Sequence, residues 1–70
     1  MAELPGAAVK RLIQHHGGGL RISGSAMSLA VQAAEEYIGR LAREAGAVAE
    51  KERRKTIMDS DIQRARESVG

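Results

Sequence analysis

The chain has 70 residues, no cysteine, a single aromatic residue and a net charge of +2. A chain this short forms one domain that buries too little surface to be comfortably stable alone, and without cysteine neither a disulfide nor a zinc–thiolate cluster can staple it. We therefore expect a core shared between chains, and the near absence of aromatic residues argues against a platform that stacks single-stranded nucleic acid.

The first predicted element is a short amphipathic helix over residues 5–16. Its apolar face recurs at helical spacing, in Val9, Leu12, Ile13 and His16. Pro5 suits the first turn of a helix. The glycines at 17–19 end the helix because glycine readily adopts left-handed conformations. A brief extended segment is predicted over residues 20–22.

A long helix follows and runs to about Glu52, capped at its start by Ser23 or Ser25. One apolar stripe consists of Ala26, Ala30, Ala33, Tyr37, Leu41, Ala45 and Val48. A second stripe consists of Met27, Val31, Ala34 and Ile38. A helix of roughly 28 residues is ~42 Å long, too long for a compact monomer of this size to cover. We expect it to pack against two short helices and a partner chain.

Gly39 and Gly46 lie seven residues apart on roughly one face of this long helix. Each is expected to destabilise the helix by about 0.5 to 1 kcal/mol relative to alanine. Either the helix tolerates them, or they permit another helix to cross closely. The sequence does not decide between these two explanations.

A short last helix is predicted after the β-branched pair Thr56 and Ile57. Asp59, Ser60 and Asp61 supply its capping groups and first-turn carboxylates. Its apolar positions are Met58, Ile62, Ala65 and Val69. The prediction is a single all-α domain over residues 1–70, in the order short helix, long helix, short helix, with an extended loop between each pair.

Basic residues gather in the first helix and in the two loops, as Lys10, Arg11, Arg21, Arg53, Arg54 and Lys55. If the loops lie side by side, these side chains form one basic edge that suits contacts to DNA phosphates. No predicted helix presents the side chains that read base edges in the major groove. Taken alone, a basic cluster of this size is more often a solvated surface.

The string Arg54-Lys55-Thr56-Ile57, followed by Asp61-Ile62, resembles the archaeal histones and their minimal bacterial relatives. The similarity covers nearly the whole chain, and residues 26–56 follow the family pattern without a gap. Pro5, Arg11 and the segment 21–23 also fall where that pattern expects them, apart from about one extra glycine in the first loop.

This resemblance implies a histone fold that forms a handshake homodimer, in which each chain's first loop pairs with its partner's second loop. It implies that Arg21 enters a minor groove beside Thr56 and that Lys55 contacts phosphate. It also implies that Arg54 and Asp61 brace the second loop, a role we favour for Arg54 over direct DNA contact. The predicted DNA-binding residues are Lys10, Arg11, Arg21, Arg53, Arg54, Lys55 and Thr56.

The chain departs from the family where dimers of fibre-forming archaeal histones contact one another. Those places are here held by Val48, Lys51 and Arg64, and two charges are costly to desolvate without partners. Glu50 and Glu52 can pair with them across an altered contact. Arg53 also replaces a helix-ending glycine. We expect a stable dimer with weak or altered stacking on DNA.

The predicted function is an architectural protein that binds duplex DNA without sequence preference, and the alternative is one half of a transcription-factor-like heterodimer. We expect that the protein is not an enzyme and that it uses no cofactor and no small-molecule substrate. His15 and His16 project about 100° apart on a helix, so no metal site is expected there. The triple glycine lacks the Gly-Lys-Ser/Thr ending of a phosphate-binding loop.

The same sequence carries no apolar run of the ~20 residues that cross a bilayer, and no signal-peptide pattern. We therefore expect no membrane partner and a cytoplasmic protein associated with the nucleoid.

Overall fold

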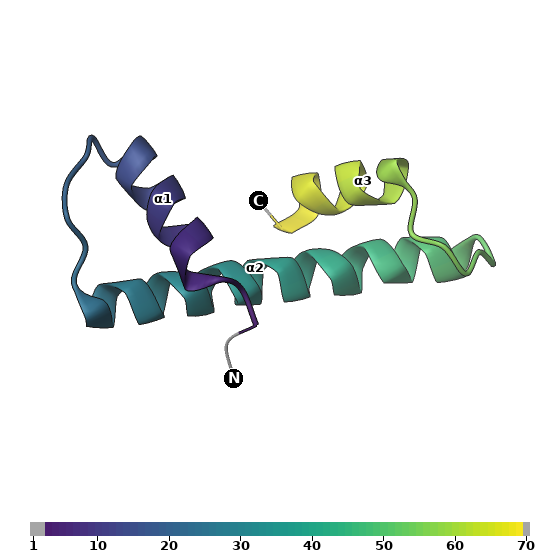
Figure 1. The fold of residues 1–70 in the computed structure, drawn as a ribbon. Helices are drawn as coiled ribbons and strands as arrows, with labels where there is room; N and C mark the ends of the chain where they lie inside the picture. The colour runs from purple at the N-terminus through teal and green to yellow at the C-terminus, as the bar shows by residue number, and fades with distance from the viewer. Residues whose placement is uncertain (1–2, 70) are drawn as a thin grey trace. The chain divides into compact units, whose positions relative to one another are not determined.

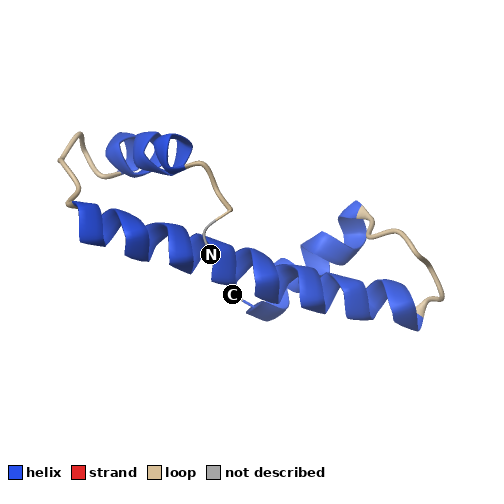
Figure 2. Ribbon diagram, turned by 60° about the horizontal axis from the view of Figure 1, so that its bottom comes forward, coloured by secondary structure: helices blue, strands red, loops and turns tan. Residues whose placement is uncertain are grey.

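The computed structural model describes residues 3–69 and contains three helices (Figures 1 and 2). They are α1 (Gly6–His16), α2 (Gly24–Lys51) and α3 (Asp59–Val69). Over residues 3–69 there is no strand. The predicted all-α class and the short, long, short order are confirmed. We call residues 17–23 the first loop and residues 52–58 the second loop.

The chain divides into two compact units, Met1–Glu36 and Tyr37–Gly70, and α2 is continuous through the boundary. In the first unit, α1 lies beside the N-terminal part of α2 (Figure 1). In the second unit, α3 lies beside the C-terminal part of α2. Each short helix is thus supported by its own half of the long one.

Helix α1 ends in a left-handed turn built from glycine. The Gly19 N–H donates to the Gln14 carbonyl at 2.8 Å, and the Gly17 N–H donates to the Ile13 carbonyl at 2.7 Å. Gly18 has a φ of 75°, a conformation that glycine adopts without steric cost. The bond from Gly19 spans six residues, as in a Schellman motif. The predicted role of the glycines as a helix stop is confirmed.

Helix α2 begins with a side-chain cap from Ser23. The Ser23 hydroxyl accepts a hydrogen bond from the Ala26 N–H at 3.1 Å. This bond satisfies one of the backbone donors that the first turn of a helix leaves without a partner. Of the two serines considered from the sequence, Ser23 is therefore the cap.

Helix α2 ends in the same type of turn as α1, but here the left-handed residue is an arginine. The Arg54 N–H donates to the Ala49 carbonyl and the Arg53 N–H donates to the Glu50 carbonyl, both at 2.9 Å. Arg53 has a φ of 59°, in the region that favours glycine. Both bonds of a Schellman motif are present, with Arg53 at the position that glycine usually occupies.

Helix α3 is capped by one of its own first-turn carboxylates. Asp61 Oδ2 accepts a hydrogen bond from the Met58 N–H, just before the helix, at 2.8 Å. Asp59 also lies in the first turn, where negative charge stabilises the helix dipole. The sequence-based expectation of first-turn carboxylates is confirmed.

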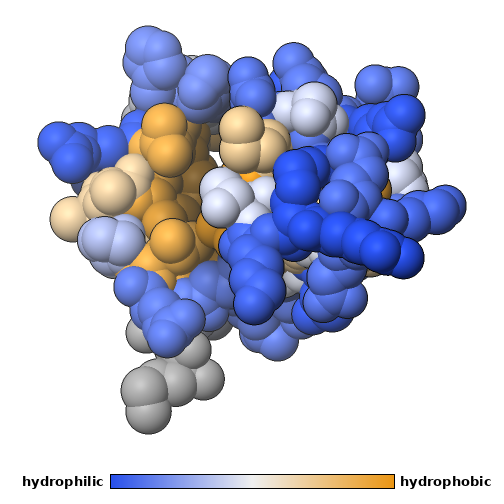
Figure 3. Space-filling view, turned by 90° about the vertical axis from the view of Figure 1, so that its right-hand side faces the viewer, coloured by the Kyte–Doolittle hydropathy of each residue, from blue (hydrophilic) through white to orange (hydrophobic). Residues whose placement is uncertain are grey.

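A single chain buries few apolar side chains. Among the described residues, the buried apolar side chains are Val31, Ala45, Ala49 and Ala65. Larger apolar side chains remain exposed, namely Leu12, Leu20, Leu29, Tyr37, Ile38, Ile57 and Met58. Figure 3 shows apolar residues at the open surface among hydrophilic ones. The chain thus leaves uncovered the kind of surface that protein association buries.

The two glycines inside α2 are not required by packing within the chain. A Cβ at Gly39 would lie 3.4 Å from Arg43 Nη1, the end of a flexible side chain, and one at Gly46 would have no described atom within 4 Å. Close crossing therefore has to come from another chain if it is the reason for these glycines.

No helix of the described part of the chain has the length and apolar character to span a membrane.

Candidate nucleic-acid interface

The second loop is held by a two-pronged ion pair between Arg54 and Asp61. Arg54 Nη1 donates to Asp61 Oδ2 and Arg54 Nη2 donates to Asp61 Oδ1, each at 2.8 Å. Asp61 is 1% exposed, so this carboxylate lies inside the second unit. Paired bonds of this geometry fix orientation as well as adding energy. Arg54 is thereby anchored to the first turn of α3.

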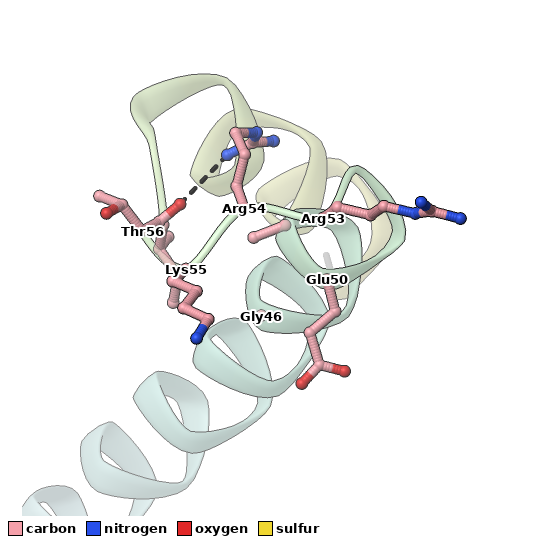
Figure 4. Close-up of a pocket in the computed structure, with 8 residues that line it drawn as sticks. Gly46, Glu50, Arg53, Arg54, Lys55 and Thr56 are labelled. Atoms are coloured by element: carbon pink, nitrogen blue, oxygen red, sulfur yellow. Dashed lines mark hydrogen bonds between the residues drawn. The ribbon is translucent and has the colours of Figure 1, made fainter.

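The same guanidinium has two further acceptors within the second loop. Nη1 also donates to the Thr56 carbonyl at 3.1 Å, the dashed bond in Figure 4, and Nη2 donates to Glu52 Oε1 at 2.9 Å. Arg54 thus joins the end of α2, the middle of the loop and the start of α3. Glu52 is a further partner in this network, and its role was not predicted from the sequence.

The ion pair shifts the pKa values of both partners. Hydrogen bonds from Arg54, and then from the Met58 N–H, lower the pKa of Asp61 from 3.8 to about 2. Hydrogen bonds to Asp61, and then to Glu52, raise the pKa of Arg54. Each group favours the charged form of the other. The loop is therefore held by full charges throughout the physiological pH range.

The remaining polar residues of the second loop face outward. Arg53, Lys55 and Thr56 are exposed, whereas Arg54 is half-buried. Figure 4 shows the Arg53 side chain pointing away from Lys55 and Thr56. These residues border a groove of about 520 Å³ that Gly46 and Ala49 also line. Within residues 3–69, neither Arg53 nor Lys55 forms an ion pair.

The other predicted basic residues belong to the first unit. Lys10 and Arg11 are exposed on α1, and Arg21 is exposed in the first loop. In the described part of the chain none of these three forms an ion pair. All three cations are therefore available to a ligand.

The structure brings together some of the predicted residues. Arg53, Arg54, Lys55 and Thr56 share one loop, and Asp61 braces it. Lys10, Arg11 and Arg21 lie in the other unit, and the 28 residues of α2 separate the two loops along the chain. The basic residues thus form two groups, one in each unit.

The residues predicted at a contact between dimers all lie in the second unit. Val48 is half-buried, and Lys51 and Arg64 are exposed. Across residues 3–69, neither of these two cations is paired with a carboxylate. Any surface that covers them must supply acceptors or leave two charges desolvated.

A contact in the first unit was not predicted from the sequence. One carboxylate oxygen of Glu35 accepts hydrogen bonds from the Glu3 and Leu4 N–H groups, the latter at 2.9 Å. These bonds, that from Leu4 first, lower the pKa of Glu35. Glu35 thus ties the segment before α1 to α2. A lone glutamate on a helix gives no signal of such a role, because its partners are backbone groups distant in sequence.

Comparison with known proteins supports one family. The family described as histone-like transcription factor (CBF/NF-Y) and archaeal histone matches residues 2–65. No significant match was found to a curated protein or to a solved structure. The matched region includes all three helices up to Ala65, both loops and the Arg54–Asp61 pair. The chain is therefore a member of the family of histone-like transcription factors and archaeal histones, a family of DNA-binding histone-fold proteins.

Proposed function

We propose that this protein is an architectural protein of the chromosome, which binds duplex DNA as a homodimer without sequence preference and without catalysis. The proposal rests on a difference between the side chains of the second loop, one of which is hydrogen-bonded within the chain while others are exposed. Arg54 is committed to Asp61, Glu52 and the Thr56 carbonyl, and this leaves Lys55 and the Thr56 side chain exposed on a braced loop. A positively charged loop held in one conformation suits phosphate binding.

The proposed DNA contacts come from both groups of basic residues, Lys10, Arg11, Arg21, Arg53, Lys55 and Thr56, with Arg54 acting chiefly through the brace. Contacts of this kind neutralise phosphates and release condensed counterions. Arg21 is the candidate for insertion into a minor groove, where width and charge are read in place of base identity. The expected binding is tight at low salt and indifferent to sequence.

We propose that a homodimer brings together the two groups of basic residues, one from each unit. Residues 1–70 form one histone-fold domain that a second copy completes. The first loop precedes α2 and the second follows it, and 28 helical residues correspond to about 42 Å. An antiparallel second copy would place each first loop beside the other copy's second loop. The exposed Leu29, Tyr37 and Ile38 of α2 supply apolar surface for such pairing.

Assembly beyond the dimer is proposed to be weak or altered. Lys51 and Arg64 are exposed cations where fibre-forming relatives pack apolar or hydrogen-bonding groups. The nearby Glu50, or Glu52 if released from Arg54, supplies acceptors for a salt-sensitive contact. Stepwise nuclease-protected fragments would indicate wrapping by stacked dimers, whereas continuous protection without steps indicates dimers that coat DNA.

Duplex binding across a salt series tests the DNA-binding proposal. The parent protein is compared with Arg21→Ala and Lys55→Ala on two duplexes of unrelated sequence. We expect affinity to fall steeply as salt rises and both variants to bind more weakly on both duplexes. Arg40→Ala is the matched control, because Arg40 is an exposed arginine of α2 outside the two loops. Affinity that does not depend on salt, or unchanged binding by both variants, would contradict the proposal.

The molecular mass of the purified chain in solution separates the two candidate functions. A folded particle of twice the chain mass supports the homodimer. A monomer, or an unfolded chain that folds only on adding another histone-fold protein, supports one half of a heterodimer. If the protein is a DNA-binding homodimer, we expect it to be associated with the nucleoid in the cytoplasm.

A further inference from the structure

Arg53 occupies a backbone position that disfavours any side chain. Its φ of 59° and the paired bonds from the N–H groups of Arg53 and Arg54 define the turn that ends α2. At the turn after α1 the corresponding residue is Gly18, with a φ of 75°, and the next residue, Gly19, is also left-handed, with a φ of 80°. A Cβ in this conformation crowds the following carbonyl, which is why glycine predominates there. Among residues 3–69, Arg53 is the one non-glycine residue with a positive φ.

Nothing within the described chain accounts for an arginine at this place. The side chain is exposed, and among residues 3–69 its guanidinium has no hydrogen-bond acceptor. Figure 4 shows it directed away from Lys55 and Thr56, although Arg53 borders the same groove as they do. The side chains of Arg53 and Lys55 thus project in different directions from one loop.

We infer that Arg53 is a second phosphate contact of the second loop, made by a guanidinium that points away from Lys55 and Thr56, and that the disfavoured backbone conformation is kept for this contact. The inference rests on the proposed DNA-binding function. Strained residues concentrate at binding sites, where an interaction with the ligand offsets the conformational cost. A planar guanidinium binds the two oxygens of one phosphate with paired hydrogen bonds, and an exposed one is free to do so. The phosphate comes either from the duplex that Lys55 contacts or from a second duplex.

Arg53→Gly separates the two halves of the inference. Glycine removes the strain and the charge together, so we expect a higher melting temperature and weaker DNA binding in the same variant. The affinity is expected to fall roughly tenfold for each lost contact near 0.1 M salt. The slope of log affinity against log salt is expected to fall by about 1 for each contact, hence about 2 for a homodimer.

Two matched variants at the same position identify the cause. Arg53→Asn tolerates the left-handed conformation but lacks the charge, and it is expected to bind as weakly as Arg53→Gly. Arg53→Lys keeps the charge, and it is expected to retain most of the salt slope. If Arg53→Lys binds as weakly as Arg53→Gly while Arg53→Asn binds like the parent, the phosphate contact is wrong.

Two DNA substrates distinguish the source of the phosphate. Binding to a short duplex that accommodates one dimer reports a contact on the same duplex. Capture of a free duplex by protein already bound to an immobilised duplex reports a contact on a second one. A loss by Arg53→Gly in either assay supports the phosphate contact and assigns its source. Parent-like behaviour in both assays would overturn the inference, while weaker binding by Lys55→Ala and Arg21→Ala in the same experiment would leave the proposed function standing.

Discussion

The two loops begin with the same backbone turn and then differ in how they are held. After α1, the left-handed residues are Gly18 and Gly19, and no side-chain hydrogen bond ties residues 17–22 to a helix of the described chain. After α2, the left-handed residue is Arg53, and Arg54 binds Asp61 of α3, Glu52 and the Thr56 carbonyl. The second loop is therefore organised within a single chain, whereas we propose that the first acquires its conformation from a partner. The variants below either remove this difference or enlarge it.

The largest effect is expected from Asp61→Asn, which removes the feature that the first loop lacks. The amide loses the negative charge and presents N–H groups where Arg54 requires an acceptor. Breaking an ion pair whose carboxylate is almost fully buried destabilises a fold more than substituting a residue at the surface does. We expect the largest drop in melting temperature of the variants described, together with weaker DNA binding as Lys55 and Thr56 lose their fixed positions.

Asp59→Asn is the control for this variant, because Asp59 is an exposed first-turn carboxylate of the same helix. Its loss should lower stability by about 0.3 to 1 kcal/mol through the helix dipole alone. Equal melting temperatures for Asp59→Asn and Asp61→Asn would show that the Arg54–Asp61 pair adds no stability beyond that of a first-turn carboxylate.

Acid should release the second loop through Asp61. The pKa of Asp61 in the folded protein is lowered from 3.8 to about 2 by the hydrogen bonds from Arg54 and the Met58 N–H. A lowered folded-state pKa adds stability that is complete well above 3.8 and is lost as the pH falls toward 2. Unfolding measured between pH 5 and pH 2 should show a steeper loss for the parent than for Asp61→Asn. Some loss should persist in the variant because the pKa of Glu35 is also lowered. Parallel curves for the two proteins would argue against the ion pair.

Exchanging the left-handed residues tests the turn that the two loops share. Gly18→Ala is expected to destabilise the protein by about 1 kcal/mol, because alanine is strained at a φ of 75°. Arg53→Gly is expected to stabilise it by about 0.5 to 1 kcal/mol for the opposite reason. Thermal or denaturant unfolding of both variants measures the pair. Changes of the same sign would mean that the two turns are not equivalent.

A smaller effect is expected at the end of the first loop, where Ser23 caps α2. Ser23→Ala removes the acceptor for the Ala26 N–H and should lower stability by about 0.5 to 1 kcal/mol. Ser25→Ala is the control, because no backbone donor of the described chain bonds to the Ser25 hydroxyl. If Ser25→Ala proves the more harmful change, the cap has been assigned to the wrong serine.

Local signals predicted most of the fold. Apolar spacing and glycines located the three helices, and the capping residues placed the helix starts within a few positions, because these features act through neighbours in the sequence. The bonds from Glu3 and Leu4 to Glu35 were beyond such reasoning, since they join backbone donors to a side chain some 30 positions away. The left-handed conformation of Arg53 was indicated only by the family pattern, because arginine itself carries no such preference.

The candidate site was predictable in part. The basic residues and the pair Arg54 and Asp61 were identified from the sequence, but the participation of Glu52 was not, because a surface glutamate two residues from an arginine has many possible partners. The pairing of the two loops is a property of two chains. It stays a prediction that a single chain does not test.

The proposed dimer is tested by the distance between the first loop of one copy and the second loop of another. The chain has no cysteine, so a spin label attached through Leu20→Cys or Ile57→Cys is unique, and both positions are exposed. Mixing and refolding the two singly labelled proteins gives dimers that carry one label of each kind. Paired loops predict a short distance between the two labels, about 20 Å or less, as expected for adjacent loop segments with flexible labels. Distances only near the ~42 Å length of α2, or no dipolar coupling, would contradict the paired loops on which the proposed DNA-binding surface depends.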